Sequence, residues 1–169
     1  MVRRMAAAIG RDMRSVGVHQ GLAPVLDVVR DARWGGGGDH RRGPYLVGTI
    51  GTAYVRAWSP PDRRHLKHFV GYSLPRRRNL APAPMGARER ADVLLPPFEM
   101  AVREGGARSR DALLHDTDGV PARPTRPADR TAPRHWGFDG TVVADYFGIA
   151  SSRYCTASRA TSPTPRGRG

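Results

Sequence analysis

Leu22-Ala-Pro-Val-Leu-Asp-Val-Val29 is an apolar run interrupted by a single carboxylate. A run of this length is typical of a buried strand in a parallel sheet. The residues from His65 to Val70 and from Gly140 to Ala144 predict two further strands. Strands that alternate with helices indicate an α/β fold with a parallel sheet.

Three segments around these strands have the pattern of helices. Apolar residues recur at helical spacing from Met5 to Val16, and Gly17 is the predicted stop. The segment Pro44 to Trp58 begins with a proline, which suits the first turn of a helix. A third helix is predicted from Ala87 to Glu104, with a kink at Pro96-Pro97.

The chain is strongly basic, with a formal net charge of +13 over 169 residues. Such a charge is typical of proteins that bind nucleic acid or an anionic membrane. The arginines, however, lie largely in Gly- and Pro-rich stretches, without the interleaved aromatic side chains of a single-strand binder. We therefore expect no nucleic-acid partner and keep a non-enzymatic nucleic-acid-binding protein as the alternative.

Cys155 is the single cysteine, which excludes an internal disulfide and a cysteine cluster for zinc. The six histidines lack ligand spacing, so we expect neither a metal nor a cofactor. The apolar core from Met5 to Ile9 is too short for a signal peptide, and no run reaches the roughly 18 apolar residues of a membrane span. The sequence predicts a cytoplasmic protein without a membrane partner, and it leaves the oligomeric state open.

Four stretches do not fit the α/β pattern, namely residues 36–43, 110–115, 123–135 and 151–169. All but the second are rich in Gly, Pro, Arg or Ser, a composition typical of loops or disorder. The last has too few apolar residues to pack, so we expect a disordered tail. Together the four stretches hold eleven arginines and three aspartates, which contribute +8 to the net charge.

Six blocks of the chain, in order, resemble glycoside hydrolase family 3 of the β-glucosidase and β-xylosidase type. They are Gly17-Val-His-Gln-Gly-Leu-Ala-Pro-Val-Leu-Asp27, Arg30-Asp-Ala-Arg-Trp-Gly35, Lys67-His-Phe-Val-Gly-Tyr72, Leu94-Leu-Pro-Pro-Phe-Glu99, Asp118-Gly-Val-Pro121 and Trp136-Gly-Phe-Asp-Gly-Thr-Val-Val-Ala-Asp145. The resemblance implies that residues 1–150 are a fragment of the family's N-terminal barrel domain. A complete (β/α)8 barrel needs about 250 residues, so we expect a partial TIM-type barrel, incomplete at both ends.

Each of the four unusual stretches stands where the family has a recognisable block that this chain lacks. A shifted reading frame of a GC-rich coding sequence can restore family-like residues in each of them. Residues 110–115, for example, can then read V-M-H-S-Y, and the tail can read as an ordinary helix. This hypothesis attributes the basic charge to the reading frame, and it keeps a pseudogene product without function as a further alternative.

The resemblance implies that Asp145, directly after the predicted strand Gly140 to Ala144, is the catalytic nucleophile. In the family the matching aspartate attacks the anomeric carbon of a terminal β-linked sugar. A separate carboxylic acid, about 5–5.5 Å away, protonates the leaving oxygen, and the configuration is retained. The implied substrate is a β-linked oligosaccharide or glycoside. The structural alternative for Asp145 is the N-cap of a following helix.

Lys67 and His68 match the pair with which the family hydrogen-bonds sugar hydroxyls. A lysine donates three protons and a histidine donates or accepts, which suits a polyol ring. A solvated lysine and a core histidine are the structural alternative. Asp27 and Arg33 match positions that we interpret as a structural pair bracing the strand ends. The family's sugar-contacting arginine is replaced here by Gly36.

By the same resemblance, the first barrel strand would precede Met1 and the general acid would come from a domain beyond Gly169. Loss of a positioned acid alone costs about 10² to 10⁴ in rate. We therefore expect no detectable glycosidase activity from the chain as given.

Overall fold

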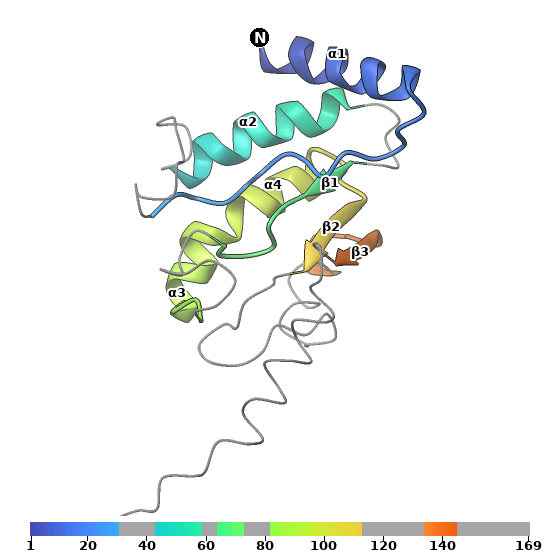
Figure 1. Cartoon of the computed structure of the whole chain (residues 1–169). Helices are drawn as coiled ribbons and strands as arrows, with labels where there is room; N and C mark the ends of the chain where they lie inside the picture. Colours follow the sequence, from blue (N-terminus) through green and yellow to red (C-terminus); the bar gives the residue numbers. More distant parts are fainter. Residues whose placement is uncertain (31–42, 59–63, 73–81, 113–133, 145–169) are drawn as a thin grey trace, which may run out of the picture.

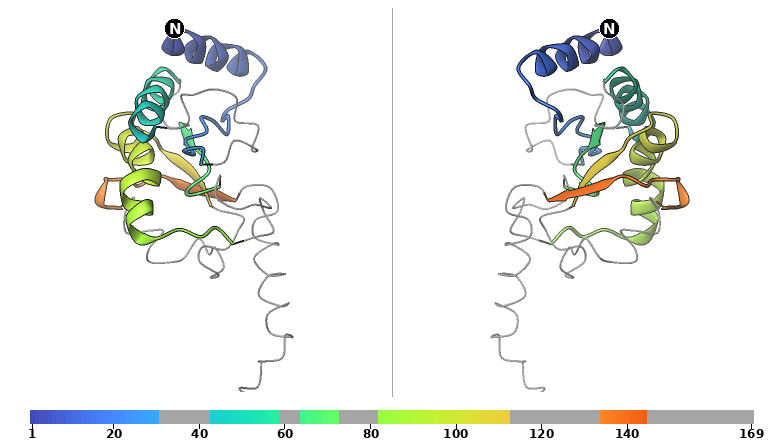
Figure 2. Two further views of the ribbon diagram at one scale, coloured as in Figure 1. Left: turned by 90° about the vertical axis from the view of Figure 1, so that its left-hand side faces the viewer. Right: turned by 90° about the vertical axis from the view of Figure 1, so that its right-hand side faces the viewer.

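The computed structural model describes residues 1–30, 43–58, 64–72, 82–112 and 134–144. They form a layer of helices beside a small parallel sheet (Figure 1). The helix α2 (Pro44–Ala57) packs against both α1 (Val2–Ser15) and α4 (Pro96–Arg103). Figure 2 shows these three helices following one another along the side of the strands. The predicted α/β class is confirmed for the described residues.

The helix boundaries follow the glycines and prolines of the sequence. The helix α1 stops before Gly17, whose φ of +77° is a conformation that favours glycine. The helix α2 has Pro44 in its first turn, where a missing N–H costs nothing. No helix in these described ranges is long and apolar enough to cross a membrane.

The predicted helix from Ala87 to Glu104 is divided into three parts. They are α3 (Ala87–Glu89), the π-helical turn η4 (Arg90–Leu94) and α4. The amide of Leu95 donates to the carbonyl of Arg90 at 2.9 Å, which closes the wider turn. Pro96 and Pro97 follow and have no N–H with which to continue the ladder. The kink predicted at this proline pair is thereby confirmed.

The sheet has three parallel strands in the order β1 (His65–Leu66), β2 (Ser109–Ala112) and β3 (Thr141–Ala144). Its register aligns the four residues of β2 with the four residues of β3. Parallel strands point their carboxyl ends to the same edge of a sheet. The described strands do not close a barrel.

Two strand predictions are wrong in extent. Within Leu22 to Val29, only Val25 forms a β-bridge, to Lys67. The predicted strand His65 to Val70 ends as β1 at Leu66. The physical reason is that the residues after Lys67 turn and direct backbone N–H groups to carboxylates instead of to a neighbouring strand.

The strand β2 was not predicted, because it contains Arg110 and Asp111 within the stretch interpreted as unusual. Both residues are buried, with exposures of 4% and 1%. Charged side chains in a buried strand hide the apolar run by which such strands are recognised. The residues 36–42, 113–133 and 151–169 lie outside the described residues, so the predictions for them, including the tail, stay predictions.

The core lies between the helices and the sheet. Phe98 of α4 is fully buried, and its ring meets the ring of Phe69 edge to face at 5.2 Å between centroids. Leu26 and Leu66, both 1% exposed, join the same cluster from neighbouring chain segments. The core therefore reaches the turn that follows β1, which is where the candidate site lies.

The start of β3 is fixed to the start of β2 by an exposed ion pair. Arg108 donates from its guanidinium to Asp139, and its carbonyl accepts from the Thr141 amide at 3.0 Å. The hydrogen bond from Arg108 and the charge of its guanidinium lower the pKa of Asp139. A lowered pKa in the folded state contributes stability above the ordinary carboxyl pKa and loses it as the pH falls through the folded value.

We therefore expect Asp139→Asn to reduce the free energy of unfolding at neutral pH. Below the folded-state pKa of Asp139, the substitution should change it little. Urea denaturation of both proteins between about pH 7 and pH 2 measures the difference. Because the pair is exposed, the difference should shrink at high salt. An equal difference at every pH would contradict the assignment of the acid-sensitive stability to this pair.

Candidate functional site

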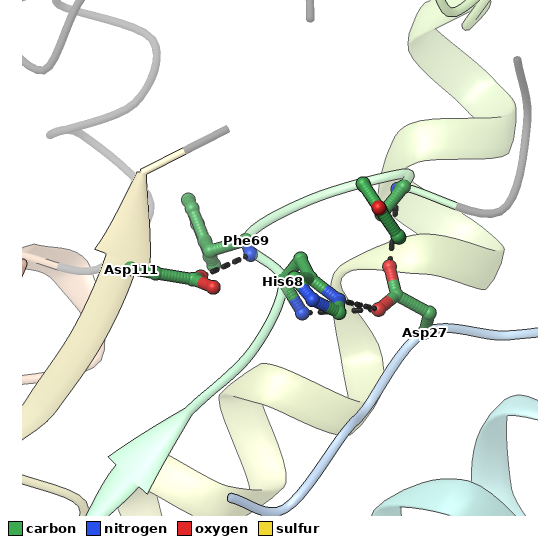
Figure 3. A network of polar contacts seen from close by, with 5 residues as sticks. Asp27, His68, Phe69 and Asp111 are labelled. Carbon is green, nitrogen blue, oxygen red and sulfur yellow. Dashed lines mark hydrogen bonds and ion pairs between the residues drawn. The ribbon is translucent and has the colours of Figure 1, made fainter. Parts of the chain in front are cut away.

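The candidate site is the segment from Lys67 to Tyr72, which we term the Lys67–Tyr72 loop. It follows β1 at the carboxyl edge of the sheet, the edge at which parallel α/β proteins commonly place their ligands. Figure 3 shows the loop between two carboxylates, Asp27 on one side and Asp111 of β2 on the other. The position of this loop therefore depends on two segments that are distant from it in sequence.

Asp27 holds the loop through both of its carboxylate oxygens. Oδ2 accepts the backbone N–H of His68 at 3.0 Å and lies 2.8 Å from the His68 Nδ1 atom. Oδ1 accepts the backbone N–H of Tyr72 at 3.0 Å. Asp27 is only 5% exposed, so these donors take the place of water around the carboxylate.

The contact with Asp27 fixes the orientation of the His68 imidazole. A carboxylate oxygen only accepts, so the His68 Nδ1 atom is the donor in this pair. In the neutral ring the Nε2 atom then carries the lone pair. The ring of Tyr72 stacks on that of His68, with centroids 4.1 Å apart. Two independent contacts therefore hold one side chain of the sequence-predicted pair in place.

Lys67 is fixed through its backbone. Its N–H donates to the carbonyl of Pro24 at 3.1 Å, and its own carbonyl accepts from Leu26 at 2.6 Å. A cis peptide bond joins Lys67 to His68. Lys67 is half-buried and directly precedes His68. The structure thus brings both predicted sugar ligands to one turn at the carboxyl end of β1.

Comparison with known families accounts for almost the whole chain. The model described as "Glycosyl hydrolase family 3 N terminal domain" matches residues 1–163. The chain belongs to glycosyl hydrolase family 3. The resemblance indicated by the six sequence blocks is thereby confirmed.

The similar proteins of family 3 are β-xylosidases and β-glucosidases. A Beta-xylosidase from Formosa agariphila is 35% identical over 158 residues, which are 86% of this chain and 22% of the xylosidase. A Beta-glucosidase from Rhizobium radiobacter is 26% identical over 155 residues, covering 90% of this chain and 19% of that protein. The chain thus spans about a fifth of the length of these relatives.

Solved structures of family 3 enzymes show the same fold. The β-glucosidase from Listeria innocua superposes with a TM-score of 0.79 at 25% identity, over 94% of this chain and 24% of that one. A second structure of the Listeria enzyme contains glucose. The β-glucosidase from Erythrobacter marinus is 31% identical, with a TM-score of 0.75 over 88% of this chain and 21% of that one.

Three residues singled out from the sequence lie outside the described residues of this family 3 chain. Asp145 directly follows Ala144, the last residue of β3, but is not itself described. Arg33 and Gly36 lie in the undescribed segment 31–42. The roles of all three stay predictions. For Asp27, the described contacts are with the Lys67–Tyr72 loop, so it braces that loop.

Asp111 is a contributor to the site that the sequence did not reveal. Its Oδ1 atom accepts the backbone N–H of Phe69 at 2.9 Å. No periodic or motif signal distinguishes it, because it stands in a stretch without a family block. Among the described residues, no group of three His, Cys, Asp or Glu side chains is placed to hold a metal ion.

Proposed function

We propose that the chain is the sugar-binding part of a partial (β/α)8 barrel that acts in retaining hydrolysis of terminal β-linked glucosides or xylosides. Membership of family 3 and the names of its relatives support this substrate class. The parallel register supports a barrel origin, since it brings the carboxyl ends of the strands to one edge.

The observation that carries the proposal is the hydrogen bond between the Asp27 Oδ2 and His68 Nδ1 atoms at 2.8 Å. With the proton on Nδ1, the neutral ring has its acceptor at Nε2, and we assign that atom to a sugar O–H. The ammonium of Lys67, on the adjacent residue, donates to a neighbouring hydroxyl oxygen. An acceptor and a donor on consecutive residues match two adjacent hydroxyls of a pyranose ring. The sugar ring is thereby positioned before any bond changes.

In the family's reaction, the aspartate that Asp145 matches attacks the anomeric carbon, and the bond from that carbon to the leaving oxygen breaks. The leaving oxygen takes a proton from a second carboxylic acid, and water then hydrolyses the glycosyl-enzyme. The two carboxyl groups described beside the loop, Asp27 and Asp111, accept backbone N–H groups, and we assign them to positioning of the loop and not to proton transfer. We propose that the 169-residue chain binds the sugar without turning it over.

The test compares binding of methyl β-glucoside and methyl β-xyloside to the original chain and to Lys67→Met and His68→Gln, by calorimetry. We expect a dissociation constant in the millimolar range, about −4 kcal/mol. Each substitution removes a hydrogen bond at a charged or fixed group and should weaken binding about tenfold. Release of nitrophenol from nitrophenyl β-glucoside should stay at the uncatalysed rate.

Arg88→Met is the matched control, because the Arg88 side chain is 95% exposed on α3 and its described ion pair is with Asp92. It should leave sugar affinity unchanged. Equal affinity in the original chain and in both loop variants would refute the assignment of Lys67 and His68.

A further inference from the structure

We infer that Asp111 is a second positioning residue of the Lys67–Tyr72 loop and that sugar affinity depends on its acceptor oxygen. The inference rests on the proposed function, because it concerns the same loop. Asp111 lies on β2, whereas Asp27 comes from the segment that bridges to Lys67. The loop is therefore held from both sides by carboxylates of different chain segments (Figure 3).

The hydrogen bonds divide the loop between these two carboxylates. Asp27 accepts the amides of His68 and Tyr72, and Asp111 accepts the amide of Phe69 between them. The N–H groups of two consecutive residues thus point to opposite sides. Each bond restricts the peptide plane next to His68. Displacement of the Phe69 amide would therefore tilt the residue that carries the sugar-facing imidazole.

Phe69 is fixed to β2 by its ring as well as by its amide. The guanidinium carbon of Arg110 lies 4.4 Å from the Phe69 ring centroid, within the range of a cation–π contact. Arg110 also donates to the carbonyl of Asp111 at 3.0 Å. On another side, the ring meets Phe98 edge to face. The strand β2 thus contacts both the backbone and the side chain of the residue that follows His68.

The burial of Asp111 makes its acceptor bond consequential. Asp111 is 1% exposed, so water cannot replace the carboxylate as partner of the Phe69 amide. A buried donor that loses its acceptor carries the full desolvation penalty. A hydrogen bond to a charged acceptor is also about twice as strong as a neutral one. Removal of this oxygen should therefore release the loop locally without requiring a change at Asp27.

The experiment compares Asp111→Leu, which removes the acceptor, with Asp111→Asn, which keeps one carbonyl oxygen at nearly the same position. The first readout is amide hydrogen exchange of Phe69 by NMR. In Asp111→Leu we expect exchange of the Phe69 amide at least about tenfold faster. The amide of Phe98, bonded within the helical region, is the reference for global opening. In Asp111→Asn, Phe69 exchange should stay within about threefold of the original chain.

The second readout is the affinity for methyl β-glucoside. If Asp111 had a merely structural role, Asp111→Asn would not selectively recover this affinity. Asp111→Leu should lower it about tenfold, and Asp111→Asn should recover most of the loss. If Asp111→Leu does not fold, Asp111→Ser takes its place, because its shorter side chain does not reach the Phe69 amide.

Unchanged Phe69 exchange in a folded acceptor-free variant would overturn the inference, as would equal loss of affinity in Asp111→Asn and Asp111→Leu. If the original chain binds no glycoside, the proposed function fails. The hydrogen-exchange rate of the Phe69 amide then still tests whether Asp111 holds the loop. The two failures are therefore distinguishable.

Discussion

Replacement of Asp27 by leucine should lower the free energy of unfolding by about 3–5 kcal/mol, because three donors lose the buried carboxylate that they share. The change leaves two backbone amides, those of His68 and Tyr72, and the His68 Nδ1 atom without their acceptor. Each orphaned buried donor costs about 1–3 kcal/mol. Urea denaturation followed by circular dichroism measures the loss.

The free energy of unfolding of Asp27→Asn should lie between that of Asp27→Leu and that of the original chain. An asparagine has one acceptor oxygen and one NH2 group, so it cannot accept on both sides as the carboxylate does. The control is Asp92→Leu, because the pair that Asp92 forms within the described residues is an exposed one with Arg88. It should change stability by less than about 0.5 kcal/mol. A loss below about 1 kcal/mol for Asp27→Leu would contradict the role of Asp27 as the brace of the loop.

Replacement of Phe98 by alanine should cost about 3–5 kcal/mol, the usual range for removing a buried aromatic ring. Phe98 is fully buried and supports the ring of Phe69 edge to face. The cavity that it leaves lies beneath the Lys67–Tyr72 loop, so we also expect weaker sugar binding. Urea denaturation gives the stability change, and calorimetric titration with methyl β-glucoside gives the affinity.

The control for Phe98 is Leu46→Ala on α2, where the leucine is 45% exposed. It should cost less than about 1 kcal/mol and leave sugar affinity unchanged. A loss for Phe98→Ala no larger than that of Leu46→Ala would refute the placement of Phe98 in the core. If Phe98→Ala loses the expected stability but keeps its affinity for the glycoside, the core does not support the loop.

The helices were predictable because their limits are set locally. A glycine with positive φ after α1 and a proline in the first turn of α2 are signals that the sequence itself displays. The strand β3 was equally accessible, since Thr141 to Ala144 is a short run of small and branched residues. Nothing in these three elements depends on a distant partner for its recognition.

The turn after β1 was not predictable, because its geometry is imposed by distant residues. The contacts of His68 and Phe69 with Asp27 and Asp111 join residues more than forty positions apart. Apolar runs do not encode such contacts. Lys67 and His68 were nevertheless singled out from the sequence, because the family resemblance depends on their motif and not on their partners. Their role as sugar ligands stays a prediction.

The strand β2 shows why a buried strand can escape recognition. Arg110 and Asp111 stand where a shifted reading frame gives valine and methionine, side chains that suit a buried strand without polar partners. In the chain as given, hydrogen bonds and a cation–π contact accompany their burial. The frame hypothesis stays a prediction that the coding DNA can test.

The most direct test of the proposal that the Lys67–Tyr72 loop binds the sugar is the ¹⁵N chemical shift of the His68 ring during titration with methyl β-glucoside. We predict a saturable shift of the Nε2 resonance, with a smaller change at Nδ1, because Asp27 keeps the Nδ1 partner. Amides of α1 should not move. An unchanged Nε2 resonance up to glycoside concentrations far above the millimolar range would contradict the loop as the sugar site.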